Sequence, residues 1–144
     1  MTHADKGKYY KKHPGDTKIS DDLQQDIAKA AKGNDISCAA AEKISRKNNI
    51  PLGEIGVGID LLNINIVQCQ LGLFGYDGKK KLVKAAEEVA ADLQQSIAAK
   101  LSGGKLPCAA AWEIALKLNI PRLNVCAACE KLKIKIKPCQ LGAF

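Results

Sequence analysis

The sequence CAAAEKISRKNNIP at residues 38–51 returns as CAAAWEIALKLNIP at residues 108–121, and this pair decides how the chain is organised. Extending the match in both directions aligns residues 22–74 with residues 92–144, at a constant offset of 70 and without a gap. Of the 53 aligned positions, 24 are identical. A repeat with a fixed register indicates two copies of one folded unit. We call residues 22–74 block one and residues 92–144 block two.

Capping residues divide each block into predicted helices. Ser20 and Ser37 have side chains suited to the N-cap position, and block two has Pro107 in place of Ser37, which the first turn of a helix tolerates. Asn49 and Asn119 end the second helix, because asparagine adopts the left-handed conformation that a tight turn needs. The pattern predicts helices at residues 20–31, 37–49, 52–62, 107–119 and 122–132, with stops at Gly33 and Gly103 after the first helix of each block.

Alternating residues follow the third predicted helix of each block. Block two has KLKIKIK at residues 131–137, and block one has LNINI at residues 62–66. A period of two predicts a strand with one polar face and one aliphatic face. Asp77-Gly78 is a typical hairpin turn, so we expect a returning strand after it. The lysines placed on these predicted strands are Lys131, Lys133, Lys135 and Lys137, and Lys79, Lys80 and Lys81.

Three helices followed by a strand or hairpin resemble the order of a winged helix. Within this order, IALKLNIPRLNVCAACEKL at residues 114–132 resembles a helix-turn-helix, and residues 44–62 match it in block one. The whole chain, with YYKKHP at residues 9–14 and its two CAAA…CQLG blocks, also resembles small proteins of anaerobic bacteria, a likeness that implies no activity. The first resemblance implies a mainly α fold with short β-strands, made of two tandem winged-helix-like repeats.

The length of each block bears on how the repeats are arranged. A 53-residue block is only marginally stable alone, because so short a chain buries too little of its surface, so we expect the repeats to pack together as a pseudo-dimer. The predicted organisation is a mobile basic tail at residues 1–19, a winged-helix-like repeat at 20–83 and a second at 84–144. The N-terminal sequence lacks the apolar core of a signal peptide, and no apolar run reaches the length of a membrane span, which predicts a cytoplasmic protein.

The positive charge of the chain is concentrated in block two. The net charge is +7, of which block two carries +5, whereas block one carries −1. This asymmetry predicts an anionic partner for block two. In a helix-turn-helix the early exposed residues of the third helix contact base edges, and the resemblance places Arg122, Asn124, Ala127 and Lys131 there. Arginine and asparagine recognise guanine and adenine, so the predicted partner is double-stranded DNA.

The matching helix of block one lacks this chemistry. Leu52, Val57 and Leu61 are apolar, and Glu54 would be repelled by phosphate. We interpret this helix as buried or as facing a protein partner. The leading hypothesis is a DNA-binding, transcription-regulator-like protein whose basic second repeat is the nucleic-acid face. The alternative is a protein-interaction or assembly module that keeps the fold without reading DNA.

Both lysine clusters have a second interpretation. The lysines of residues 131–137 either contact phosphate or guard an edge strand against pairing with other chains. The lysines of residues 79–81 either contact phosphate from a wing or are simply solvated. Sequence alone leaves both alternatives open.

Six cysteines without an export signal are first considered as thiols or ligands. A third hypothesis is therefore a zinc or iron–sulfur site formed by cysteines at matching positions of the two blocks. The matched cysteines of each block are 31 residues apart in apolar surroundings, unlike the close pairs of typical metal sites, so we expect buried thiols and no metal. Cys126 and Cys129 have a metal-like interval but lie inside a predicted helix. The matched cysteines are Cys38, Cys69, Cys108 and Cys139.

Motifs of catalysis are lacking in the sequence. Its two histidines, His3 and His13, both lie in the N-terminal tail. No paired carboxylates, nucleophile elbow or phosphate-binding loop occurs. The sequence therefore predicts a protein that is not an enzyme and has no cofactor.

Overall fold

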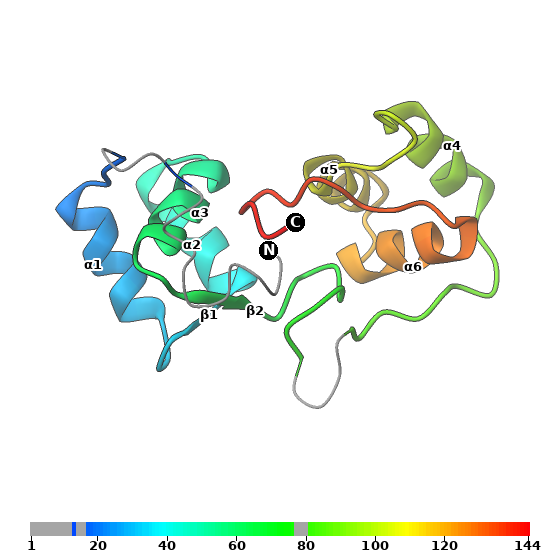
Figure 1. Ribbon diagram of the computed structural model, residues 1–144. Coiled ribbons are helices and arrows are strands. Elements are labelled where there is room, and N and C mark those ends of the chain that lie inside the picture. The colour runs from blue at the N-terminus through cyan, green and yellow to red at the C-terminus, as the bar shows by residue number, and fades with distance from the viewer. Residues whose placement is uncertain (1–12, 14–16, 77–80) are drawn as a thin grey trace. The chain divides into compact units, whose positions relative to one another are not determined.

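The computed structural model describes residues 13, 17–76 and 81–144, which form six helices and two short strands (Figure 1). The fold is mainly α, as the sequence predicts. The chain divides into two compact units. Among the described residues, unit one contains 13, 17–69 and 140–144, and unit two contains 70–76 and 81–139.

Unit one is built from three helices and a small parallel sheet. Its helices are α1 (Asp21–Ala30), α2 (Cys38–Asn48) and α3 (Leu52–Leu61). Strand β1 (Asp35–Ser37) pairs in parallel with β2 (Asn65–Val67). The three helices contact one another, and β1 leads directly into α2, so the sheet lies at the start of that helix.

Unit two repeats this arrangement with a shorter strand pairing. Its helices are α4 (Ala91–Lys100), α5 (Cys108–Leu118) and α6 (Arg122–Leu132). A single parallel bridge joins Leu106 to Ile136. These residues match Ile36 and Ile66 at the offset of 70, and Ile36 pairs with Ile66 in unit one. The two blocks therefore share one topology, and the predicted repeat is confirmed at the level of its helices.

The predicted caps form as expected. The hydroxyl of Ser20 accepts a hydrogen bond from the amide of Leu23 at 3.2 Å, and that of Ser37 accepts one from the amide of Ala40 at 3.1 Å. Asn49 and Asn119 adopt left-handed conformations, with φ of 53° and 54°. These local interactions explain why helix bounds were predictable from sequence.

The hydrophobic core uses equivalent positions in the two blocks. Most core positions on the helices of unit one have a buried counterpart 70 residues later in unit two. Burial of apolar surface, at about 25 cal/mol per Å², is the main force that holds each set of helices together. The matched buried pairs are Leu23 and Leu93, Ile27 and Ile97, Ala41 and Ala111, Ile44 and Ile114, Ile55 and Val125, and Ile59 and Cys129.

The strand predicted at residues 131–137 does not form. Helix α6 continues through Leu132, and Lys133 ends it in a left-handed conformation with φ of 58°. The amide of Lys133 donates to the carbonyl of Glu130, and the amide of Ile134 donates to the carbonyl of Cys129 at 2.9 Å. This helix-ending turn uses the backbone groups that a strand starting at Lys131 would need, so only Ile136 pairs, as a single bridge.

The strand predicted at residues 62–66 is also wrong in position and in partner. Asn63 has a φ of 57° and ends α3, so the strand begins only at Asn65. Its partner β1, which the sequence analysis did not predict, comes earlier in the chain and runs parallel to it. The described residues show no antiparallel wing after α3 or α6, and the predicted turn at Asp77-Gly78 lies outside them.

The ends of the two blocks are exchanged between the units. Residues 140–144, which end block two, belong to unit one, and residues 70–74, which end block one, belong to unit two. In unit one a Cβ atom on Gly56 would overlap the backbone carbonyl of Leu141, so this tail lies directly on α3. In unit two a Cβ atom on Gly72 would touch the side chain of Leu123 on α6. The predicted boundary between residues 83 and 84 did not anticipate this exchange.

Candidate nucleic-acid interface

The predicted lysines of block two all lie at the surface of unit two. We call Lys105 and these lysines the lysine surface; its members are Lys105, Lys131, Lys133, Lys135 and Lys137. All five are exposed. The aliphatic residues between these lysines are less exposed, since Leu132 and Ile134 are half-buried and Ile136 is buried. The predicted separation of lysine from aliphatic side chains therefore holds, although the backbone is not a strand.

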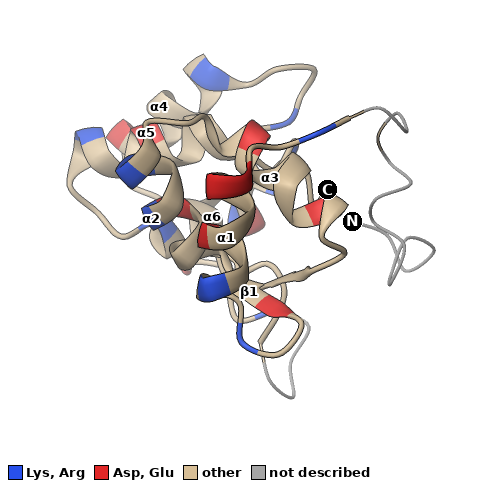
Figure 2. Ribbon diagram, turned by 90° about the vertical axis from the view of Figure 1, so that its left-hand side faces the viewer, with Lys and Arg blue, Asp and Glu red and all other residues tan. Residues whose placement is uncertain are grey.

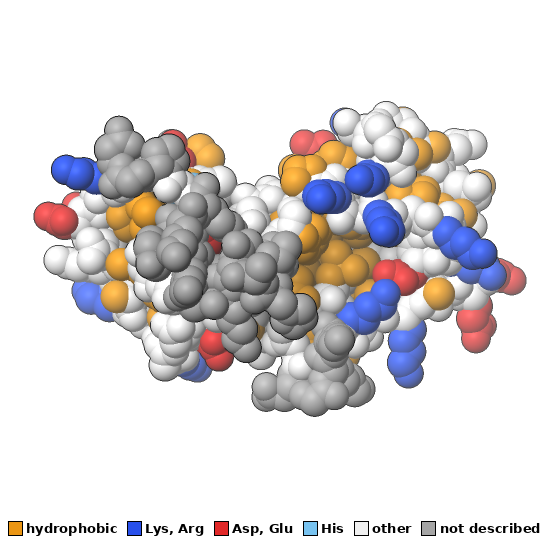
Figure 3. Space-filling model, in the orientation of Figure 1, with side chains coloured by type: hydrophobic (Ala, Val, Ile, Leu, Met, Phe, Trp, Pro, Cys, Tyr) orange, Lys and Arg blue, Asp and Glu red, His pale blue; other side chains and the backbone are white. Residues whose placement is uncertain are grey.

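The lysine surface has no carboxylate partner within the described part of the chain. None of its five lysines forms an ion pair there. Figure 3 shows Lys and Arg side chains gathered on the face of unit two that carries the segment after α6. Exposed ammonium groups without neighbouring carboxylates create a positive potential that attracts anions.

Lys105 and Lys135 occupy positions that hold a hydrogen-bonded pair in unit one. Their counterparts are Asp35 and Asn65, which lie opposite each other in the β1–β2 ladder. The amide nitrogen of Asn65 donates to the carboxylate of Asp35 at 3.2 Å. In unit two both partners are lysines, each preceding one residue of the bridged pair. Like charges directly opposite each other destabilise strand pairing, and unit two has one bridge where unit one has three residue pairs.

The charge difference extends over the whole of each unit. Unit two carries twelve Lys and Arg residues against six Asp and Glu, whereas unit one carries ten against nine. Figure 2 looks onto unit one and shows both signs of charge on its helices. In α1 the acidic residues Asp21 and Asp22 lie in the first turn and Lys29 in the last, an order that favours the helix dipole. The excess of positive charge is thus a property of unit two.

Arg122, the predicted guanine-reading residue, is already engaged inside unit two. Its guanidinium lies 3.7 Å from the centre of the Trp112 ring. It also donates a hydrogen bond of 2.7 Å to the side-chain oxygen of Gln70. The cation–π contact and the hydrogen bond hold Arg122 against the protein. Asn124, the other predicted reading residue, is exposed on α6, and Ala127 is half-buried.

Trp112 and Gln70 were not predicted as parts of this site. A signal for Trp112 was present in the divergence of the blocks, because Trp112 and Arg122 replace Glu42 and Leu52 together. In unit one Glu42 instead accepts a hydrogen bond of 2.8 Å from Arg46. Two coupled replacements at neighbouring helices indicate a contact. The part played by Gln70 could not be seen in this way, because it depends on the exchanged segment.

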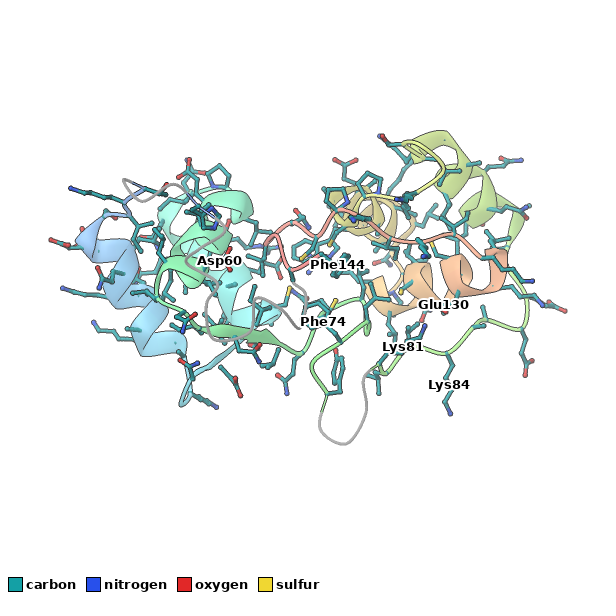
Figure 4. All side chains as sticks on the ribbon, in the orientation of Figure 1. Asp60, Phe74, Lys81, Lys84, Glu130 and Phe144 are labelled. Carbon is teal, nitrogen blue, oxygen red and sulfur yellow. The ribbon has the colours of Figure 1, made fainter. Side chains whose placement is uncertain are left out.

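Of the three lysines predicted on a returning strand, only Lys81 lies among the described residues. Lys81 forms an ion pair of 2.7 Å with Glu130 on α6, and Figure 4 shows the two side chains directed toward each other. Lys84 points away from α6 in the same view. Lys79 and Lys80 lie outside the described residues. A lysine paired with a carboxylate carries less of the potential that attracts phosphate, so Lys81 contributes less than the lysine surface.

The acidic residue that pairs with Lys81 has an equivalent in unit one. Glu130 matches Asp60 in the sequence repeat. The carboxylate oxygen Oδ2 of Asp60 lies 2.8 Å from Nε2 of His13, at hydrogen-bond distance. Asp60 is buried, with 2% of its surface exposed. In both units, an acidic residue near the end of the third helix therefore binds the segment that precedes the block.

The four cysteines considered as metal ligands are divided between the units. Cys38 and Cys69 belong to unit one, and Cys108 and Cys139 belong to unit two. Among the described residues, no three or more His, Cys, Asp or Glu side chains are arranged to hold a metal ion. Five of the six thiols are buried, and Cys139 is half-buried. Burial raises the pKa of the Cys129 thiol to about 11, with a further contribution from the charge of Glu130.

The apolar side chains of α3, the third helix of block one, are partly buried. Leu52, Val57 and Leu61 are each half-buried, and only Glu54 among the four contrasted residues is exposed. Gly56, which lies between them, contacts the tail that contains Leu141. Part of this helix is therefore covered by a segment of the chain itself.

Comparison of the chain with protein-family models, with curated proteins and with solved structures found no match. Across residues 17–76 and 81–144, every helix falls short of the length and apolar content needed to cross a bilayer.

Proposed function

We propose that the chain is a DNA-binding protein of the transcription-regulator type, in which the lysine surface of unit two contacts the phosphate backbone. The observation that carries this proposal is the placement of Lys105 opposite Lys135, where unit one has the hydrogen-bonded pair Asp35 and Asn65. Two lysines at such a position cost stability in the isolated protein. An anionic partner removes that cost, because each phosphate neutralises lysine charge and releases a counterion.

The helix pairs support the same proposal. Helices α5 and α6 are joined by a tight turn through Asn119, and we interpret the pair as helix-turn-helix-like. In this interpretation Asn124 contacts a base edge from α6, and Arg122 is a positioning residue that fixes α6 through Trp112 and Gln70. The winged-helix interpretation of the whole repeat remains a proposal of the same kind.

A salt titration tests the phosphate contacts. Fluorescence anisotropy with a labelled mixed-sequence duplex should show affinity that falls steeply with salt for the unsubstituted chain. The variant K133N/K135N carries the asparagines that block one has at these positions. It should bind all duplexes more weakly, and its salt slope should be smaller by about two, one for each lost phosphate contact.

A charge-matched variant controls for net charge. K29Q/K43Q removes the same charge from exposed helix positions of unit one, and it should keep the salt slope of the original chain. Equal loss in the two variants would point to a general charge effect rather than to a surface. If the original chain binds no duplex at low ionic strength, the DNA proposal fails. The lysines then serve to protect the edge of Ile136 from pairing, and the protein-interaction hypothesis takes its place.

Sequence preference is tested separately at Asn124. Asn124→Ala should reduce the discrimination between preferred and random duplexes, since a lost base-edge contact costs about 1–3 kcal/mol at one base pair. Its salt slope should not change, because phosphate contacts are kept. Unchanged discrimination would remove Asn124 from the reading role without affecting the lysine surface.

A further inference from the structure

The tail of block two binds unit one in a way that only glycine permits. The backbone of Leu141 approaches α3 so closely that a Cβ atom at Gly56 would overlap its carbonyl. Leu141 and Ala143 are buried, with 2% and 1% of their surface exposed. We call the surface of α3 around Gly56 the Gly56 face. Its contact with the tail joins backbone to backbone, so the fit depends on the absence of a side chain.

Unit two has no glycine at the position that matches Gly56, although its exchanged segment, residues 70–74, also contacts the third helix at Leu123. The residue at the matching position of α6 is Cys126, a buried residue whose Cβ occupies the space that Gly56 leaves open. The tails differ at the matching position too, since Ala143 is buried whereas Leu73 is half-buried. A small residue in the tail therefore accompanies the glycine on the helix. These paired differences assign the tail at residues 140–144 to unit one.

We propose that the Gly56 face binds the 140–144 segment of a second copy of this chain, by exchange of the tail between molecules. The tail follows directly on the last residue of unit two, Cys139, whereas its own contacts are with unit one. An exchanged contact between two chains is identical to the contact within one chain, and only the effective concentration of the tail differs. This proposal is independent of the DNA-binding proposal.

The effective concentration predicts when exchange occurs. A tail on a short connection is present at an effective concentration on the order of millimolar, so the original chain stays internally bound at lower protein concentrations. If the Gly56 face and the tail of the same chain cannot bind each other, the tail of a second chain no longer competes with an internal one. Two variants achieve this from opposite sides: Gly56→Leu blocks the Gly56 face, and Leu141→Asp disables the tail.

Mixing the two variants tests the exchange. The Leu141→Asp chain has an empty Gly56 face and is labelled with ¹⁵N, and the unlabelled Gly56→Leu chain supplies an intact tail. At total concentrations up to about 1 mM, the effective concentration of a tethered tail, amide signals of Ile55 and Gly56 should shift in the mixture, and native mass spectrometry should show a heterodimer. Each variant alone should remain monomeric.

A neighbouring glycine on the same helix gives the control. Gly53 has open space around its Cβ position, so Gly53→Leu keeps its own tail bound and should neither shift the labelled signals nor form the heterodimer. A mixture without shifts or heterodimer would overturn the proposal. If the Leu141→Asp chain is unfolded alone, adding the Gly56→Leu chain should restore its folded spectrum, and failure to do so would equally overturn it.

Discussion

Units one and two share their helices and core positions but differ at three surface contacts. The strand pair contains Asp35 and Asn65 in unit one and two lysines in unit two. A second contact joins Glu42 to Arg46 in unit one, whereas Trp112 stacks on Arg122 in unit two. The third helix accepts a tail at Gly56 only in unit one. The two units therefore share one core, whereas the excess of positive charge is found in unit two and the contact at Gly56 in unit one.

The largest effect is expected at the docking position of unit one. Gly56→Ala places a Cβ atom against the carbonyl of Leu141, and overpacking of this kind costs about 1–3 kcal/mol. Urea unfolding followed by circular dichroism should show this loss in the free energy of unfolding.

The control on the same helix should change stability in the other direction. Gly53→Ala meets open space and should leave stability unchanged or raise it by up to about 1 kcal/mol, since alanine is the better helix former. Equal effects of the two substitutions would show that the tail does not lie on Gly56.

The next effect is expected in unit two at alkaline pH. The pKa of the Cys129 thiol rises from about 9 in the unfolded chain to about 11 in the folded protein. Below pH 9 the thiol is protonated in both states. Between about pH 9 and 11 only the unfolded chain loses the proton, so stability must fall as pH rises through this window.

The matched residue of unit one, Ile59, provides the comparison for this pH effect. Cys129→Ala should lower stability at neutral pH, because a buried side chain is shortened, but it should flatten the decline in the urea midpoint between about pH 9 and 11. A decline of the same slope in this variant would assign the alkaline effect to other groups.

The helix caps should show a smaller difference between the units. Ser37→Ala removes the hydroxyl that accepts the amide of Ala40, and should cost about 1 kcal/mol. Block two has Pro107 at this position, without a side-chain cap. Pro107→Ser should therefore stabilise unit two by up to a similar amount, as measured by thermal unfolding. A destabilised Pro107→Ser variant would show that proline has a separate role there.

The smallest effect is expected from converting the lysine pair into its counterpart. Lys105→Asp with Lys135→Asn installs the pair found in unit one, and should stabilise unit two by about 0.2–1 kcal/mol. Hydrogen exchange should become slower at Leu106 and Lys137, whose amides form the bonds of this pairing. The same variant should bind DNA more weakly, so stability and binding change in opposite directions. Parallel losses in both would contradict the proposed role of the pair.

Local chemistry determined what could be predicted from the sequence. Helix bounds followed from Ser20, Ser37, Asn49 and Asn119, because caps and left-handed turns depend on residues a few positions apart. The exposure of the lysines in residues 131–137 followed in the same way, because charged side chains stay in water whichever backbone conformation carries them. The internal repeat predicted that both blocks share one order of helices, and the structure confirms this order.

Tertiary contacts decided the remaining features. The alternating sequence at residues 131–137 predicts a strand, but the end of α6 uses the backbone groups of Lys133 and Ile134 first. Strand β1 is only three residues long, too short for periodicity to reveal, and it forms because β2 pairs with it from across the unit. The hydrogen bond from Arg122 to Gln70 and the contacts of the exchanged segments, residues 70–74 and 140–144, join positions about 50 or more residues apart. Such contacts depend on packing in three dimensions, since no local pattern specifies which segment reaches a given helix.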